Sequence, residues 1–281
     1  MKERILTKRH MGAFEEYLQR EEKSSNTVLK YLRDVHVFAA FANGKKITKQ
    51  AVIAYKEYLL GSGYAVRSVN SMLASINCLF TFLCWEDCKI KTVKLQRQLF
   101  CSEEKQLTRA EYLRLCRTAK VQHRERLTLI LQTICGTGIR VSELPYITVD
   151  AVQTGKAVVS LKGKTRTIFI VRKLQQKLLR YISEQKIQSG SVFITRSGKP
   201  LSRTNIWREM KTLCAEAGVD AKKVFPHNLR HLFARTFYNM EKDVVKLADI
   251  LGHSSVDTTR IYTISTGTEH RRCMENLRLI L

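Results

Sequence analysis

Apolar residues recur at the three- and four-residue spacing of an α-helix along most of this 281-residue chain. Four such segments lie between about residues 8 and 83, and the last of them carries Val69, Met72, Leu73 and Ile76. A further apolar helix is expected from Arg126 to Cys135. Helical spacing resumes later over 174–186, 205–217, 228–240, 244–251, 256–262 and 269–279. The sequence therefore predicts a mainly α-helical protein.

One interval departs from this pattern. The segments Ile147–Val152, Ala157–Leu161 and Thr165–Val171 are rich in β-branched residues, which favour strands. The last two are joined tightly around Lys162-Gly163-Lys164. We expect a small three-stranded antiparallel β-sheet inside the helical second half of the chain.

The helical periodicity fades between about residues 91 and 106, where the chain becomes polar and charged. A new helix is signalled at Thr108 by a capping box, in which Thr108 and Glu111 satisfy each other's free backbone amides. The sequence therefore predicts a helical N-terminal domain over residues 1–98, a linker over 99–106 and a second domain over 107–281.

Lysine and arginine outnumber aspartate and glutamate by 49 to 25, which gives a formal net charge of +24. Such an excess indicates a polyanionic partner, because each neutralised phosphate releases counterions. An anionic membrane surface is the competing explanation. It is less favoured because the basic residues are spread along the chain, and no apolar run reaches the roughly 18 residues of a membrane span. Candidate phosphate contacts in the first domain, each of which could also be an ordinary solvated side chain, are Lys30, Arg33, Lys45 and Arg67.

Four short motifs in the second domain carry residues suited to phosphodiester chemistry. In PHNLRH, His227 and Arg230 are three residues apart and share one helical face, although a merely structural capped helix explains this stretch equally well. Arg140 follows a glycine-rich turn, and His253 follows a helix stop at Gly252. Tyr262 offers a phenol that nearby cations could activate as a nucleophile.

A metal centre is not expected, because the eight cysteines lack paired zinc spacing and carboxylates do not cluster as two-metal chemistry requires. Cations would then bind the phosphate oxygens in place of a metal. The cysteines are typical of reduced, buried side chains in an intracellular protein.

The four motifs occur in the order TGIRVSEL, PHNLRH, LGHSS and TTRIYT, and together they resemble the catalytic signature of the tyrosine recombinase (phage integrase) family, Xer-like. The segment EEYLQREEKSSNTVLKYLRDVHVFAAF is similar to the opening of that family's core-binding domain. The resemblance implies a SAM-like, DNA-binding N-terminal bundle followed by a DNA breaking-rejoining catalytic domain.

The resemblance also implies a role for each motif residue. Arg140 and Arg230 would clamp the scissile phosphate, and His227 would bind it or assist proton removal. His253 would contact a nonbridging oxygen. Tyr262 would attack the phosphorus, leaving a 3′-phosphotyrosyl bond and a free 5′-hydroxyl, without metal or other cofactor.

The family uses a lysine on a β-hairpin as the acid that protonates the departing 5′-oxygen. The hairpin here is shorter than the usual pattern. Alignment on Arg166 makes Lys162 the match, whereas alignment on the Gly-Lys pair makes it Lys164. Lys162 is favoured as the acid, and Lys164 is then a DNA contact.

The partners implied by the resemblance are double-stranded DNA with inverted-repeat core sites and further copies of the chain. A tetramer would pass through a Holliday junction, and the C-terminal helix could dock in a neighbouring protomer or close its own domain. The setting would be a bacterial cytoplasm, at the nucleoid. Integration or excision of a mobile element, DNA inversion and chromosome dimer resolution all remain open. So do a type IB topoisomerase and a catalytically silent DNA-binding relative.

Overall fold

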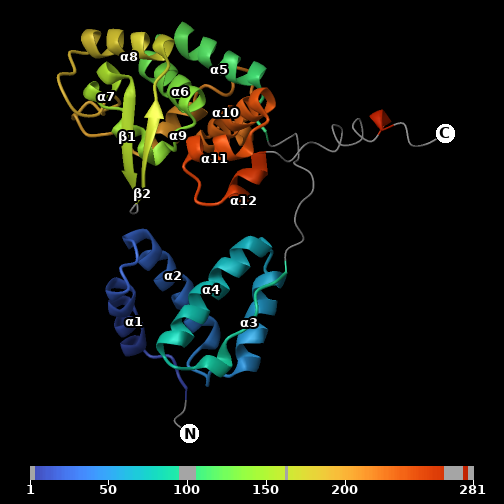
Figure 1. The fold of residues 1–281 in the computed structure, drawn as a ribbon. Helices are drawn as coiled ribbons and strands as arrows, with labels where there is room; N and C mark the ends of the chain where they lie inside the picture. Colours follow the sequence, from blue (N-terminus) through green and yellow to red (C-terminus); the bar gives the residue numbers. More distant parts are fainter. Residues whose placement is uncertain (1–3, 95–105, 162–163, 263–274, 278–281) are drawn as a thin grey trace. The chain divides into compact units, whose positions relative to one another are not determined.

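A computed structural model describes residues 4–94, 106–161, 164–262 and 275–277. The chain divides into two compact units, Met1–Arg97 and Gln98–Leu281 (Figure 1). Each unit contains a hydrophobic core of its own. The predicted linker falls almost entirely outside the described residues. Among the helices that are described, none is long and apolar enough to cross a membrane.

In its described residues the N-terminal unit holds a bundle of four α-helices, as the periodicity predicted, and a short 3-10 helix. The elements are α1 (Lys8–Arg20), α2 (Ser25–Ala42), α3 (Lys49–Gly61), α4 (Val66–Phe82) and η1 (Glu86–Cys88). Thr7 and Thr48 cap α1 and α3 by accepting a hydrogen bond from a backbone amide of the first turn. Large aromatic side chains fill the centre, and Phe38 packs edge-to-face against both Tyr55 and Phe80.

A buried carboxylate ties α2 to α4 in this unit. Asp34 is 1% exposed, and its Oδ2 lies 2.6 Å from the Lys30 ammonium and 2.8 Å from the Ser75 hydroxyl that donates to it. Lys30 also donates to the Ser71 carbonyl at 2.7 Å. Because a buried charge is tolerated only when it is paired and hydrogen-bonded, this network makes Asp34 compatible with the core.

The C-terminal unit is built around α6, a largely buried helix that packs against α5, α8 and α10. Its α-helices are α5 (Arg109–Val121), α6 (Glu125–Thr137), α7 (Val149–Thr154), α8 (Arg172–Glu184), α9 (Arg203–Lys211), α10 (Pro226–Glu241), α11 (Val244–Leu251) and α12 (Val256–Thr259). Its 3-10 helices are η3 (Val141–Tyr146), η4 (Ala221–Lys223) and η5 (Arg260–Tyr262). The capping box predicted at Thr108 is present and opens α5. The predicted C-terminal helix lies mostly outside the described residues.

The prediction of a three-stranded sheet is wrong. The described residues hold a two-stranded antiparallel hairpin of β1 (Lys156–Leu161) and β2 (Lys164–Phe169), in which Lys156 pairs with Phe169 and Leu161 with Lys164. The expected first strand forms α7 instead. Thr148 caps this helix through the Ala151 amide, and the helical spacing of Val149 and Val152 buries both side chains. Only Thr148 keeps a β-bridge, to Ser191.

Candidate active site

The motif residues of the C-terminal unit converge although they come from four separate segments. Arg140 stands at the N-terminus of η3, whereas His227 and Arg230 lie in the first turns of α10. His253 follows α11, and Tyr262 ends η5. Arg140 and His253 each follow a helix that ends at a glycine, which is why helix stop signals in the sequence located these two residues.

Three arginines meet the C-terminal end of α11. Arg166 of β2 donates to the Ile250 carbonyl, Arg230 donates to that of Leu251 at 2.8 Å, and Arg140 donates to that of Gly252 at 3.2 Å. The last carbonyls of a helix lack partners within it and carry the negative end of the helix dipole. The end of α11 therefore gathers three cations side by side.

Two glycines permit this close packing. Gly252 has φ +62°, and a Cβ atom added to it would lie 2.3 Å from Cδ of Arg166. Gly138 has φ +66°, and a Cβ there would lie 2.5 Å from Cδ1 of Phe233 on α10. The Gly138 carbonyl also accepts a hydrogen bond of 2.5 Å from the buried Arg230. Both positions need glycine for backbone conformation and for space.

Among the described residues, Glu143 is the carboxylate that forms ion pairs with these arginines. Its Oε1 accepts from Arg140 at 2.8 Å, and its Oε2 accepts from Arg166 at 2.5 Å and from the Arg140 backbone amide at 2.9 Å. Burial raises the pKa of Glu143, but the amide and the two guanidinium groups outweigh burial and hold that pKa below its usual range. Glu143 is therefore ionised at neutral pH.

The cluster nevertheless carries surplus positive charge. Arg230 is 3% exposed and, within the described part of the chain, forms no ion pair with a carboxylate. Burial and then repulsion from Arg140 lower the pKa of Arg230 to about 10, although its interaction with Tyr262 opposes both. Arg230 thus remains a cation at neutral pH, held only by dipoles. Such a site favours an incoming anion.

His253 connects this cluster to the tyrosine. Its Nε2 lies 3.0 Å from an Arg230 nitrogen, and its Nδ1 lies 2.7 Å from the Thr259 hydroxyl. Arginine can only donate, so His253 Nε2 accepts, and the ring proton sits on Nδ1 and points to Thr259. Burial, reinforced by the neighbouring arginines, lowers the pKa of His253 to about 4. The imidazole is therefore neutral at pH 7.

Tyr262 is 4% exposed and packs against two imidazoles. Its ring is stacked on that of His253 with centroids 5.9 Å apart, and it meets the ring of His231 edge-to-face at 4.6 Å. His231 in turn has its Nε2 atom 2.9 Å from Nε2 of His227. Burial lowers the pKa of His227, with Arg230, Arg203 and Arg140 adding to the effect.

The structure thus brings together Arg140, His227, Arg230, His253 and Tyr262. Three further residues of the cluster, Glu143, Arg166 and His231, were not predicted as site residues. Two of them could have been found from the sequence. Glu143 lies three residues after Arg140, and His231 is the second histidine of PHNLRH. Lys162 lies outside the described residues. Lys164 opens β2, and its side chain is not described.

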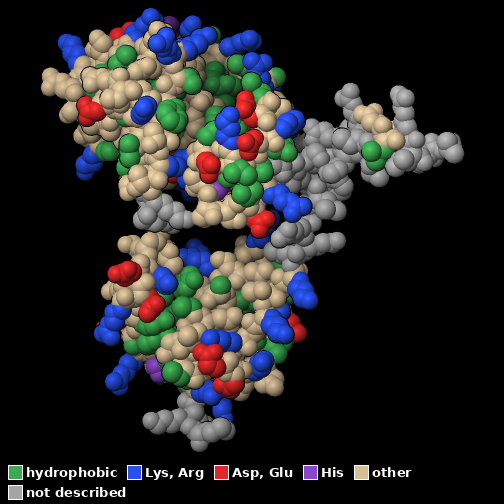
Figure 2. Space-filling view, viewed as in Figure 1, with side chains coloured by type: hydrophobic (Ala, Val, Ile, Leu, Met, Phe, Trp, Pro, Cys, Tyr) green, Lys and Arg blue, Asp and Glu red, His purple; other side chains and the backbone are tan. Residues whose placement is uncertain are grey.

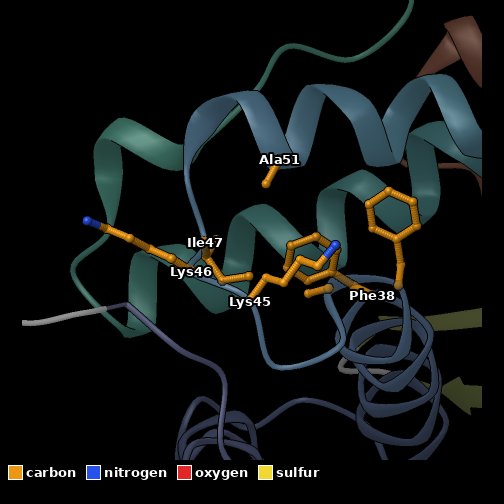
Figure 3. A pocket seen from close by; sticks show the side chains of 7 residues that line it. Phe38, Lys45, Lys46, Ile47 and Ala51 are labelled. Carbon is orange, nitrogen blue, oxygen red and sulfur yellow. The ribbon is translucent and has the colours of Figure 1, made fainter.

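The basic residues predicted to contact DNA from the N-terminal unit occupy different settings. Lys30 is committed to Asp34, Arg33 is largely exposed 3.4 Å from the same carboxylate, and Arg67 is exposed on α4. Lys45 lines a pocket of ≈ 250 Å³ formed with Phe38, Phe41, Ala42, Lys46, Ile47 and Ala51, and it points away from Lys46 (Figure 3). Lysine and arginine side chains are scattered over the visible face of both units (Figure 2).

Comparison with known proteins matches both units. Residues 105–269 match the model of the phage integrase family, and residues 12–87 match that of the phage integrase N-terminal SAM-like domain. Tyrosine recombinase XerA of Pyrococcus horikoshii is 31% identical, and XerA of Pyrococcus furiosus is 29% identical; each alignment covers 100% of this chain and 98% of the relative.

The fold is also similar to that of solved structures. The integrase of transposon Tn1549 in complex with transposon right end DNA gives a TM-score of 0.72 at 15% identity. The alignment covers 96% of this chain and 99% of the integrase. At that identity the likeness concerns the fold alone.

Proposed function

The chain belongs to the phage integrase family of tyrosine recombinases, and from that premise we propose that it is a site-specific recombinase that cleaves and rejoins DNA through Tyr262. The observation that carries this proposal is the packing of Tyr262 against His231 and His253, beside a cluster of arginines with surplus positive charge. A nucleophile, proton carriers and cations are what metal-independent phosphodiester exchange requires.

The cleavage step follows from these groups. The Tyr262 hydroxyl oxygen attacks the scissile phosphorus, and its proton passes to His227. The bond to the 5′-oxygen breaks as the 3′-phosphotyrosyl bond forms, and Lys162 gives its proton to the departing oxygen. Arg140 and Arg230 bind the nonbridging oxygens as negative charge builds there, and His253 contacts one of them. One phosphodiester replaces another, so attack by a 5′-hydroxyl reverses the step and no external energy source is needed.

The contacts of the arginines support a change of partners when DNA binds. Arg140 has a side chain that is 39% exposed, and it holds the Gly252 carbonyl through a long hydrogen bond of 3.2 Å. This bond is easily exchanged for a phosphate oxygen, which accepts a stronger, charge-assisted hydrogen bond. Arg230 is buried against two carbonyls and sets the position of the site.

The proposed partners follow from the same reaction. Residues 1–98 act as the core-binding domain, 99–106 as linker and 107–281 as catalytic domain. Two inverted-repeat sites are held by a tetramer and recombine through a Holliday junction. Lys30 is committed to Asp34, so Arg33, Lys45 and Arg67 are the stronger candidates for backbone contacts, with Lys164 from the hairpin. The protein acts in a bacterial cytoplasm, at the nucleoid.

Covalent capture tests the proposal. Wild type and Tyr262→Phe are expressed in a bacterial host and denatured in detergent, and protein-linked DNA is recovered and sequenced at its ends. We expect adducts with wild type only, flanked by an inverted repeat. Scattered ends would indicate a topoisomerase-like activity, and DNA binding without any adduct would indicate a silent DNA-binding relative.

The lysine is tested in the same assay. Lys162→Ala and Lys164→Ala are compared on DNA whose leaving 5′-oxygen is replaced by sulfur, which departs without protonation. The variant that is slow on the ordinary substrate and recovers on the sulfur substrate lacks the general acid. If only Lys164→Ala recovers on the sulfur substrate, Lys164 and not Lys162 is the general acid.

A further inference from the structure

His231 lies between two side chains of the proposed cleavage reaction, yet the reaction as written gives it no part. Its Nε2 atom is 2.9 Å from Nε2 of His227, and its ring meets the ring of Tyr262 edge-to-face with centroids 4.6 Å apart. It follows Arg230 directly on α10. One side chain therefore contacts the proposed nucleophile and the proposed proton acceptor together.

We propose that His231 is a positioning residue for strand cleavage, which fixes the His227 imidazole and the Tyr262 ring relative to each other. The inference rests on the proposed function. Residues four apart on a helix stand one above the other, so α10 itself sets the spacing of the two imidazoles. Edge-to-face packing restrains the tyrosine ring without occupying its hydroxyl group.

The hydrogen bond between the two imidazoles also determines which nitrogen of His227 can react. One proton lies between the two Nε2 atoms, so one ring donates and the other accepts. In either arrangement Nε2 of His227 is occupied, and Nδ1 is the nitrogen left for the substrate. To accept the Tyr262 proton at Nδ1, His227 must donate its own Nε2 proton to His231.

His231 is suited to accept that hydrogen bond. Burial, reinforced by repulsion from His227, Arg230 and Arg235, lowers the pKa of His231 to about 4. The ring is therefore neutral at pH 7 and keeps a lone pair. When His227 gains the tyrosine proton and becomes a cation, the same hydrogen bond becomes charge-assisted and stronger. His231 thereby stabilises the protonated state of His227 without taking the proton itself.

Imidazole NMR tests the hydrogen bond without any DNA. The full chain is labelled with ¹⁵N-histidine and compared with His231→Phe and His231→Gln. Phenylalanine keeps an aromatic ring against Tyr262 but cannot bond to His227, whereas glutamine places an amide near the former Nε2. We expect wild type to show one shared Nε2 proton, and His231→Phe to lose this signal. A His227 spectrum that is the same in wild type and His231→Phe would overturn the inference.

Cleavage of the DNA recovered by covalent capture tests the consequence. At saturating DNA, we expect His231→Phe to form adduct about tenfold more slowly than wild type, because small misplacements of reacting groups are costly. Its Kd for DNA should stay within about twofold, and His231→Gln should recover most of the rate. Asn239→Ala, at an exposed position of the same helix, is the control and should match wild type.

The outcomes separate this inference from the proposed function. Wild type that forms no adduct overturns the proposed function. If wild type and His231→Phe form adduct equally fast, the role of His231 is overturned, whereas the proposed function stands. Equal loss in His231→Phe and His231→Gln, together with a lower Tm in both, would mean that His231 serves only the stability of the fold.

Discussion

The N-terminal unit buries Asp34 and the C-terminal unit buries Glu143, and the two carboxylates face cations in different surroundings. Asp34 pairs with Lys30, whose side chain is 29% exposed, and with Arg33, which is mostly in water. Glu143 pairs with Arg140 and Arg166, and the latter is 12% exposed. Arg230, which shares the end of α11 with both, is almost fully buried.

The two networks differ in whether the cation in excess of the carboxylate is exposed to water. In the N-terminal unit the second cation is solvated, so the buried network is complete without any ligand. In the C-terminal unit the surplus cation is desolvated and held by carbonyl dipoles, which stabilise it less than a carboxylate would. A complete network serves the fold, whereas an incomplete one is a site for an anion.

Each unit contains one of the two tryptophans, Trp85 and Trp207, which allows the units to be followed separately. In a Trp85→Phe background, fluorescence reports unfolding of the C-terminal unit; in a Trp207→Phe background, it reports the N-terminal unit.

The largest expected effect comes from neutralising Glu143. Glu143→Gln leaves Arg140 and Arg166 without their shared carboxylate, and we expect the C-terminal unit to lose about 3 kcal/mol of unfolding free energy. Asp34→Asn should cost the N-terminal unit only about 1 kcal/mol, because Lys30 can turn toward water. Urea unfolding followed by each tryptophan measures both. Equal losses in the two units would contradict the distinction drawn between their networks.

The next effect concerns the glycine at the end of α11. Gly252→Ala introduces a Cβ atom against Arg166 at a positive φ, so we expect a loss of about 2 kcal/mol in the C-terminal unit. Gly12→Ala is the control, since a Cβ there meets nothing within 4 Å in the interior of α1. It should stabilise the N-terminal unit by about 0.5 kcal/mol. If Gly252→Ala is as stable as wild type, the Arg166 side chain moves away from the added Cβ atom without a cost in free energy.

Local signals explain how much of this cluster could be predicted from the sequence. Most of the described helices followed from apolar spacing, and Arg140 and His253 were found because each lies within two residues after a glycine that ends a helix. The strand predicted over Ile147–Val152 was wrong, because β-branched residues three apart are buried equally well when they lie on one face of a capped helix.

The rest depends on contacts between distant segments. Arg166 and Ile250 are 84 positions apart, and nothing local to either indicates that a guanidinium meets a helix-end carbonyl. The Lys30 and Asp34 pair has readable i, i+4 spacing. Its burial between α2 and α4, which commits Lys30 to the fold, becomes visible only when the helices are packed.

A smaller effect is expected from an added anion. Sulfate, as a mimic of the phosphate, should stabilise the C-terminal unit by about 1.4 kcal/mol at a concentration tenfold above its Kd. Sulfate also strengthens apolar burial in general, so the N-terminal unit is the internal control, at ionic strength matched with chloride. Arg140→Gln should remove the difference between the units. An equal response of both units would mean that the arginine cluster binds no anion.

The smallest expected effect is that of mild acid. The pKa of His231 is about 4 in the folded chain, below the ordinary value of 6.5. Between these values the unfolded state binds a proton that the folded state does not, so stability falls as pH decreases from 7 toward 4. After allowance for solvent screening, His231 should contribute about 1 kcal/mol to the loss between pH 7 and pH 5.

His231→Gln should therefore narrow the difference between the pH 7 and pH 5 unfolding free energies of the C-terminal unit, read from Trp207. Glu143 does not complicate this window, because a carboxylate whose pKa is depressed loses its contribution only as pH falls further, through its folded-state pKa. The N-terminal unit of the same variant should keep its wild-type pH dependence. If His231→Gln loses as much stability on acidification as wild type, His231 gains its proton in the folded state as readily as in the unfolded one. The imidazole would then not be the neutral acceptor that His227 requires.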